Sequence, residues 1–221
     1  MRTKLFKAIS ALALIASFAL LGFFILNMPK APKANIKERV APDLSVFFAD
    51  MSKLNLPENI FISSAKKYEG KYYIADAIAK KVYCIDGNSN ILWESKGQDS
   101  FILPNRKFPL DISEDGNLWV ANTGKFRLEQ LDLNTGKFIA SWQARDKLKG
   151  CCNPVGLVAL SGGRFLAMEK GVNLLKLFNP DGSTEILGKL SGNWLDYEVE
   201  KENDKIIYCD GLELKYLTLE D

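Results

Sequence analysis

Hydrophobic and polar positions alternate in short runs that recur along most of the chain. Each of four apolar runs follows a turn-forming pair and ends at a residue with a side-chain oxygen. The runs are Tyr72–Ala75, Leu118–Ala121, Phe165–Met168 and Ile206–Cys209. The turns before them are Glu69-Gly70, Asp115-Gly116, Gly162-Gly163 and Asn203-Asp204, and the residues after them are Asp76, Asn122, Glu169 and Asp210. The steps between these end residues are 46, 47 and 41 positions, so the chain contains an internal repeat.

Each repeat contains further strand-like segments. A second turn follows 17–20 positions after the first, as at Asp86-Gly87 and Asp181-Gly182. An alternating run such as Arg127–Leu133 lies between the two turns, and a shorter run such as Phe138–Trp142 follows the second turn. Short runs joined by Gly, Asp and Asn turns are typical of antiparallel strands, here labelled a to d within each repeat. A period of 40–50 residues then predicts an all-β fold, a β-propeller of about four four-stranded blades.

The fourth repeat is incomplete. It offers strands a, b and c at Leu195–Val199, Ile206–Cys209 and Leu212–Leu219, but no strand d. An unassigned run, Leu44–Phe48, stands before the first repeat. We expect this run to pair with Leu212–Leu219, because the pairing would close the ring and cover an exposed sheet edge.

The start of the chain predicts a membrane segment. Arg2, Lys4 and Lys7 precede the uncharged 19-residue run Ala8–Leu26, which as a helix would span about 28 Å, enough for a bilayer core. The run ends in bulky residues where signal cleavage needs small ones, which favours an uncleaved transmembrane helix over a cleaved signal. The expected organisation is an anchor or signal segment at 1–28, a linker at 29–42, and the propeller at 43–221, on the periplasmic or extracellular side.

Composition narrows the function classes. From residue 30 onward 26 basic residues face 27 acidic ones, a balance that predicts no nucleic-acid partner. The chain has no histidine, which excludes Ser-His-Asp and Cys-His catalytic sets and histidine-ligated metals. The leading interpretation is therefore a binding or interaction module rather than an enzyme, anchored to the membrane by its N-terminal helix. Its partner would be a protein or a small-molecule ligand at the propeller face.

Three segments resemble NHL-repeat propellers. They are Pro109–Gly124, Asn153–Gly171 and the short stretch Gly150–Pro154, which is followed by Glu169–Gly171. The first is similar to the family's run P-x-x-I-x-x-D-G-x-I-Y-V-A-D-x-G. The resemblance covers roughly residues 57–221 and implies the fold rather than an activity. Family members usually have six blades, so three forms stay open: a four-blade ring, a partial propeller completed by self-association, and a shortened member.

Propeller geometry places the b–c and d–a loops on one face, the expected ligand face. Asp76, Asn122, Glu169 and Asp210 would then ring one opening, where four oxygen donors suit calcium as a cofactor. The alternative is that each of these side chains caps its own turn. A calcium site would make the chain a calcium-dependent propeller hydrolase or lyase, the second functional hypothesis.

Further ligand-face candidates are Cys151, Cys152, Asn153, Arg106 and Lys170. The adjacent cysteines lie in a d–a loop, and Arg145, Lys147 and Lys149 nearby are expected to lower the thiol pKa. This pair carries a third hypothesis, a thiol-based redox or metal-handling module. Cys84 and Cys209 are expected to be packed thiols. The pairs Lys66-Lys67 and Lys80-Lys81 are expected to lie on solvated strand edges.

Overall fold

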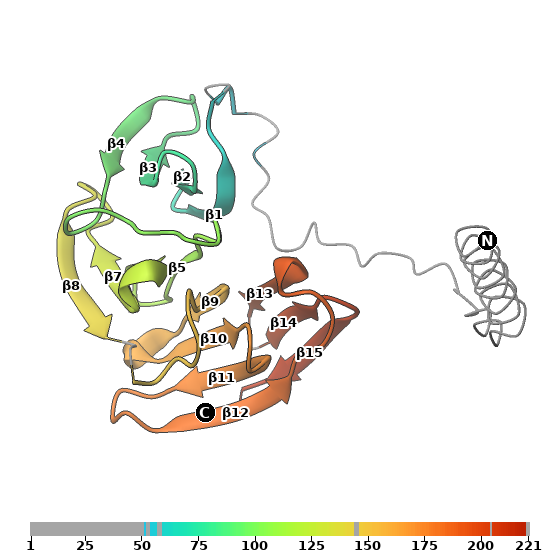
Figure 1. The fold of residues 1–221 in the computed structure, drawn as a ribbon. Helices are drawn as coiled ribbons and strands as arrows, with labels where there is room; N and C mark the ends of the chain where they lie inside the picture. The colour runs from blue at the N-terminus through green and yellow to red at the C-terminus, as the bar shows by residue number, and fades with distance from the viewer. Residues whose placement is uncertain (1–50, 52–53, 57–58, 144–145, 204, 220–221) are drawn as a thin grey trace, which may run out of the picture. The chain divides into compact units, whose positions relative to one another are not determined.

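The computed structural model describes residues 51, 54–56, 59–143, 146–203 and 205–219, and these residues form fifteen strands in four antiparallel sheets (Figure 1). The first sheet holds β1 (Ile62–Tyr68), β2 (Lys71–Asp76), β3 (Lys81–Ile85) and β4 (Ile91–Ser95). The second holds β5 (Leu110–Ile112), β6 (Leu118–Asn122), β7 (Arg127–Leu131) and β8 (Phe138–Gln143). The third holds β9 (Gly156–Ala159), β10 (Phe165–Glu169), β11 (Leu174–Phe178) and β12 (Thr184–Lys189). The fourth holds β13 (Tyr197–Glu202), β14 (Lys205–Asp210) and β15 (Leu214–Thr218).

Strand order within each sheet follows the chain, so every sheet is one predicted repeat. The second strand of each sheet, at β2, β6, β10 and β14, coincides with a predicted b run. Some boundaries differ from the prediction. The predicted strand Leu212–Leu219 is observed as Leu214–Thr218, and the run Arg127–Leu133 forms a strand only to Leu131. Leu195, predicted to begin the first strand of the fourth repeat, belongs to the 3-10 turn η4 (Trp194–Asp196), and β13 begins at Tyr197. The Asn193 side chain accepts a hydrogen bond from the Leu195 N–H, which caps this turn and delays the strand.

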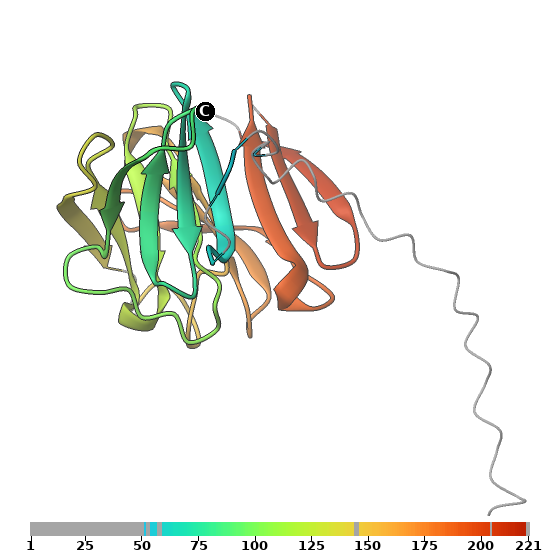
Figure 2. The same ribbon diagram turned by 90° about the horizontal axis from the view of Figure 1, so that it is seen from above.

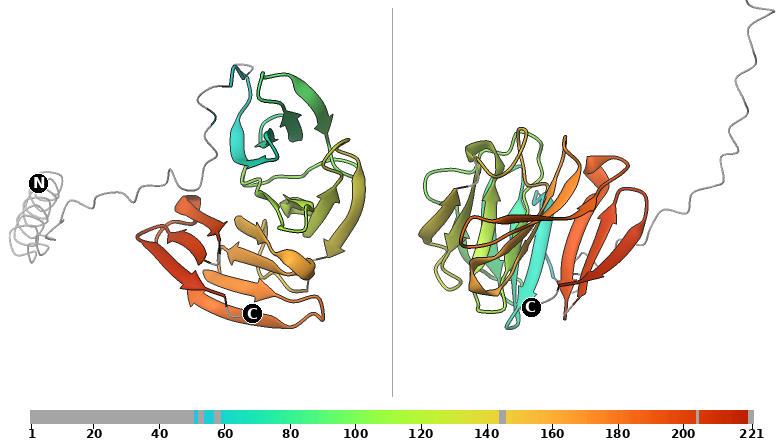
Figure 3. Two further views of the ribbon diagram at one scale, coloured as in Figure 1. Left: turned by 180° about the vertical axis from the view of Figure 1, so that it is seen from behind. Right: turned by 90° about the horizontal axis from the view of Figure 1, so that it is seen from below.

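The four sheets surround a common axis as the blades of a propeller. The innermost strands contact one another in sequence, β1 with β5, β5 with β9, and β9 with β13. Figure 2 and the right panel of Figure 3 show the strands of the sheets running from one side of the propeller to the other. The predicted all-β, four-blade propeller is therefore confirmed for the described residues.

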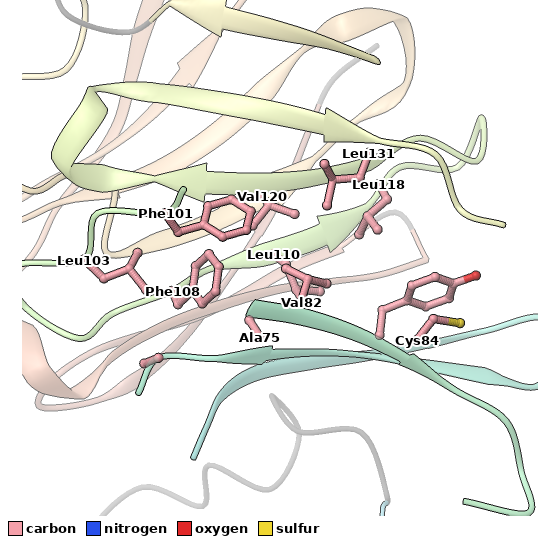
Figure 4. Close-up of a cluster of buried hydrophobic side chains, with 12 residues drawn as sticks. Ala75, Val82, Cys84, Phe101, Leu103, Phe108, Leu110, Leu118, Val120 and Leu131 are labelled. Carbon is pink, nitrogen blue, oxygen red and sulfur yellow. The ribbon is translucent and has the colours of Figure 1, made fainter. Parts of the chain in front are cut away.

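Packing between neighbouring sheets explains why the b strands are buried on both faces. Ala75 and Val82 of the first sheet pack against Leu110 and Val120 of the second (Figure 4). Side chains alternate between the two faces of a strand, so each inner strand supplies the cores on both of its sides.

Aromatic rings fill the next interface. Trp119 and Trp142 of the second sheet contact Phe165 of the third at ring-centroid distances of 4.9 and 5.3 Å. Trp142 also contacts Phe178 at 5.5 Å. Large rings suit the space between two twisted sheets because each buries a wide apolar area.

The first sheet has an apolar cluster on the face that does not pack against the second sheet. The fourth sheet has a separate one on the face that does not pack against the third sheet. Ile74 and Ile85 pack with Leu54 and Leu56, whereas Ile207 packs in a second cluster with Cys209 and Leu214. Among the described residues the fourth sheet has three strands. The strand expected at Leu44–Phe48 lies outside the described residues, so its pairing with β15 stays a prediction.

The N-terminal expectations also fall outside the described part of the chain. Within that part, no helix combines the length and apolar character needed to cross a bilayer. The run Ala8–Leu26 and the boundaries at 1–28 and 29–42 stay predictions.

Candidate functional site

Loops gather on one side of the propeller, as the repeat predicted, and we call this side the loop face. It is formed by the b–c loops and by the connections between sheets. Its described segments are 77–80, 96–109, 123–126, 146–155, 170–173, 190–196 and 211–213. The opposite side, here the turn face, carries the short a–b and c–d turns at 69–70, 86–90, 113–117, 132–137, 160–164, 179–183 and 203.

Two of the four side chains predicted as calcium ligands cap the turn that follows them. Asp76 is buried, and its Oδ1 accepts hydrogen bonds from the N–H groups of Ile78 and Ala79, each at 2.8 Å. Asp210 is likewise buried, and its Oδ1 accepts from the N–H groups of Leu212 and Glu213 at 2.9 and 3.0 Å. Both side chains therefore fix a b–c loop through local bonds.

The other two predicted ligands, Asn122 and Glu169, form hydrogen bonds to a loop that connects two sheets. Asn122 accepts a hydrogen bond from the Ile102 N–H at 3.0 Å and donates to the Ser100 carbonyl at 3.0 Å. Glu169 accepts from the Lys149 N–H at 3.2 Å. Each side chain thus holds the loop that enters its own blade from the previous one.

At three of these four positions the side chain also forms a hydrogen bond with a side chain on the neighbouring c strand. Asn122 donates to Glu129 Oε1 at 2.7 Å, and both carboxylate oxygens of Glu169 accept from Lys176 Nζ at 3.0 and 2.9 Å. Lys215 Nζ donates to Asp210 Oδ2 at 2.7 Å. These partners were not predicted from the sequence, although Glu129 stands seven residues after Asn122 and Lys176 seven residues after Glu169.

The bonds around Asp210 change its acid strength. Burial raises the pKa of its carboxyl, but Lys215, the Ser191 hydroxyl and the N–H groups of Leu212 and Glu213 stabilise the anion. The hydrogen bonds prevail and lower the pKa of Asp210 to about 2. This carboxylate stays ionised across the physiological range.

The arrangement of these four side chains does not support the expected calcium site. Asp76, Asn122, Glu169 and Asp210 each lie in their own blade with the partners given above. No group of three or more acidic or cysteine side chains in metal-binding proximity occurs among the described residues. Calcium stays a prediction of the sequence.

The two cysteines of the loop before β9 differ in access. Cys151 is exposed, whereas Cys152 is buried, with 9% of its surface accessible. Burial and the adjacent Cys151 raise the pKa of the Cys152 thiol, and Lys170 opposes them only in part. The expectation that neighbouring basic residues would lower the thiol pKa was therefore wrong for Cys152, because desolvation outweighs the nearby positive charge.

Amide side chains hold this loop against its neighbours. Asn153 is fully buried, donates to the carbonyls of Lys149 and Lys170 at 2.5 and 3.1 Å, and accepts from the Lys170 N–H at 3.0 Å. Asn105 Nδ2 donates to the Cys152 carbonyl at 3.0 Å, which joins the two consecutive inter-sheet loops. Asn153 thus has a positioning role that the sequence did not reveal.

Arg106 and Lys170 both lie in loops of the loop face, and their role as ligand contacts stays a prediction. The Arg106 side chain is exposed, and its carbonyl accepts from Ser63 Oγ at 3.3 Å. Lys170 Nζ lies 4.5 Å from the centre of the Trp194 ring, a cation–π contact. Of the predicted candidates, Arg106 and Cys151 are the two that present exposed side chains.

A second feature, not predicted from the sequence, lies on the propeller axis. Lys66 Nζ on β1 is 3.2 Å from Asp111 Oδ1 on β5 and also pairs with Glu200 of β13. Asp111 Oδ2 accepts a hydrogen bond from the Ala159 N–H of β9 at 2.8 Å. One polar cluster therefore links all four innermost strands, and the prediction that Lys66 lies on a solvated edge was wrong.

This axial cluster carries one cation and two carboxylates. Burial lowers the pKa of Lys66, but Asp111 and Glu200 together raise it above its ordinary value. Burial also raises the pKa of Glu200, and Asp111 adds to this effect while Lys66 opposes it. Cavities of about 30 Å³ and about 120 Å³ flank the cluster along the axis, and Glu200 lines both.

Comparisons with known proteins found solved structures with a similar fold but no related sequence. No family model matches the chain, and no curated protein matches it. Virginiamycin B lyase from Staphylococcus aureus is similar over 71% of this chain, with 12% identity and a TM-score of 0.44. BamB from Moraxella catarrhalis is similar over 73%, with 13% identity and a TM-score of 0.42.

A computationally designed protein, Ika4, is similar over 76% of this chain, with 12% identity and a TM-score of 0.46. The chain covers 96% of Ika4 but only 55% of the lyase and 48% of BamB, about half of each of these two proteins. Identities this low carry no activity from one protein to another. The resemblance to NHL-repeat proteins stays a prediction.

Proposed function

We propose that the chain is a membrane-anchored binding module that works outside the cytoplasm and binds its partner on the loop face. The anchor would be Ala8–Leu26, with the charge-free length that a bilayer core requires. The binding surface would be built on the loops that carry Arg106 and Cys151. Function lies on loops held by a rigid scaffold more often than on the scaffold itself.

The observation that carries this proposal is the fixing of the loops by the side-chain amides of Asn105 and Asn153. Asn105 joins two consecutive inter-sheet loops through the Cys152 carbonyl, and Asn153 joins the second of them to Lys170. Loops held in one conformation before binding lose less entropy when a partner arrives. The exposed side chains of Arg106 and Cys151 are presented on this fixed frame.

The alternative of a calcium-dependent enzyme has less support. The carboxylate oxygens of Asp76, Glu169 and Asp210 already accept hydrogen bonds from loop N–H groups or lysines. A metal would have to compete with these partners. The redox alternative is likewise weakened, because burial raises the pKa of Cys152.

Two measurements on the full chain test the proposal. Intact mass of protein extracted from membranes should match the whole sequence, and the protein should resist salt and alkaline washes. A mature N-terminus near Ala31 or Ala34 would overturn the anchor.

Site-specific photo-crosslinking in cells tests the binding surface. A photoreactive residue in place of Arg106 should form adducts, identified by mass as protein, lipid or small molecule. The same residue in place of Asn88, exposed on the turn face, is the matched control. Equal adducts at both positions, or none at Arg106, would contradict a binding role for the loop face.

A further inference from the structure

Charge is segregated between the two faces of the propeller. The described segments of the loop face carry eight basic and four acidic residues. The basic ones are Lys80, Lys96, Arg106, Lys107, Lys125, Lys147, Lys149 and Lys170, and the acidic ones are Asp99, Asp146, Asp196 and Glu213. The turn face carries the opposite balance, with two basic residues, Lys137 and Arg164, and six acidic ones, Glu69, Asp86, Glu114, Asp115, Asp132 and Asp181.

Several of the loop-face cations are available to a partner. Lys80, Arg106 and Lys149 are exposed and form no ion pair within 4.0 Å with a carboxylate that the structure describes. Lys107 and Lys125, by contrast, pair with Glu198 and Asp99 at 2.8 and 3.0 Å. A near-neutral domain with its charges separated in this way has an electric dipole that orients it toward an anionic surface.

Large apolar side chains stand on the same face. Exposed on or beside its loops are Phe61, Ile78, Ile102, Val172 and Leu195. Phe61 and Ile78 adjoin strands of the first sheet, Val172 lies in a loop of the third, and Ile102 and Leu195 lie in connections between sheets. Ile78 and Leu195 are each 53% accessible. The other exposed large apolar side chains of the described residues lie on the outer strands β4, β8, β12 and β15. Ile91, Leu92 and Ile139 stand beside the turn face, at the first or second residue of β4 and β8. The described turns themselves carry none, whereas four of the five loop-face residues lie within its loops.

We propose that the loop face docks on a lipid bilayer that contains anionic headgroups. Bulky apolar side chains at separate loop tips, interspersed with lysine and arginine, suit the interfacial layer, where the apolar groups enter and the cations meet phosphate. The apolar residues are dispersed around a face rather than gathered in one groove, which suits a flat lipid surface better than a peptide. The inference names a partner for the face in the proposed function, and it rests on that proposal for the nearness of the membrane.

The chain supplies its own reporter for this docking. Cys151 is exposed on the loop face, whereas Cys84, Cys152 and Cys209 are buried. A fluorophore on Cys151 can be read in full-length protein mixed with vesicles that contain a nitroxide-quencher lipid. The vesicles would be phosphatidylcholine alone or phosphatidylcholine with phosphatidylglycerol. We expect strong quenching with the anionic vesicles, weak quenching with the neutral ones, and a loss of quenching at high salt.

Matched variants make the test specific. Leu195→Glu should shift the equilibrium between docked and undocked loop face on anionic vesicles about tenfold toward the undocked state, read as lost quenching of the Cys151 label, since it replaces an inserting group with a repelled one. Ile186→Glu, the same change at a 60% accessible position on β12, should leave the quenching unchanged. A label on Asn88→Cys, in a Cys151→Ser background, should stay unquenched because it marks the turn face.

The outcomes separate this inference from the proposed function. Protein that incorporates into both vesicle types without quenching of the Cys151 label has an anchor but no docking face, which overturns the inference. Quenching with anionic vesicles, in protein that washes off at high salt, supports docking and overturns the anchor. Equal losses for Leu195→Glu and Ile186→Glu would also overturn the inference and favour a protein partner for this face.

Discussion

Lys66 Nζ lies 3.2 Å from Asp111 Oδ1, a contact that joins the innermost strands of the first and second blades. Glu200 of the fourth blade pairs with the same ammonium, and the third blade donates the Ala159 N–H to Asp111. The first and fourth sheets have separate apolar clusters on their outer faces. The axial cluster is therefore a direct link between these two blades in the described part of the chain.

Replacing Lys66 with methionine should destabilise the fold by about 3 kcal/mol, because two poorly solvated carboxylates lose their cation. Urea unfolding followed by circular dichroism would measure the loss. Lys67→Met, at the adjacent and exposed position, is the matched control and should change little. A loss below that of the control would remove the structural role assigned to Lys66.

The pH dependence of stability should identify Glu200 as the strained partner. Its pKa lies above the ordinary value, so its favourable contribution is present in acid and is lost as the pH rises through the folded-state pKa. Glu200→Gln should therefore gain stability relative to wild type as the pH rises above about 4.5. Glu202→Gln, on the exposed end of the same strand, should follow the wild-type curve. Parallel curves for Glu200→Gln and wild type would contradict the shift.

Asp210 should affect stability at a lower pH than Glu200 does. Its pKa is lowered to about 2, so its contribution is present above the unfolded pKa and is lost as the pH falls through the folded-state value. Asp210→Asn should cost about 2 kcal/mol at neutral pH, and the gap should close between about pH 4 and pH 2. Asp146→Asn, on an exposed loop, is the control. A gap that persists at pH 2 would assign the loss to packing instead.

Alkylation of the native protein should distinguish Cys151 from the other three cysteines. Cys151 is exposed and should react with iodoacetamide under native, reducing conditions. Cys84, Cys152 and Cys209 are buried, and burial raises the pKa of each thiol, so they should react only after denaturation. Peptide mass spectrometry would give the four rates. Equal rates at Cys151 and Cys152 would contradict the packing of this loop.

Deleting residues 43–50 tests the predicted strand of the fourth blade. Without it, β15 should present an unpaired edge, and the variant should aggregate or elute as a larger species in gel filtration. Deleting residues 32–39, a segment of equal length in the predicted linker, is the matched control. A 43–50 deletion that melts and elutes like the parent would contradict closure by this segment.

The sequence by itself determined the repeat, the strand order and the loop face. Turn pairs such as Asp115-Gly116, and the alternation of apolar side chains around them, are local features, so the strands they predict are those observed at β6 and its equivalents. Arg106, Cys151 and Lys170 lie in loops of the loop face, an assignment that depends only on which strands a loop connects, whereas their role as ligand contacts stays a prediction.

Only the tertiary structure decided which polar side chains are buried and with what partners. In the sequence Lys66 is indistinguishable from Lys67, yet one reaches the axis and the other is exposed, since adjacent residues of a strand point to opposite sides. Asp111 and Glu200 stand 45 and 134 positions after Lys66, so no local pattern could pair them. The pKa of the Cys152 thiol is likewise raised first by burial, which depends on the whole fold, and only then by the adjacent Cys151.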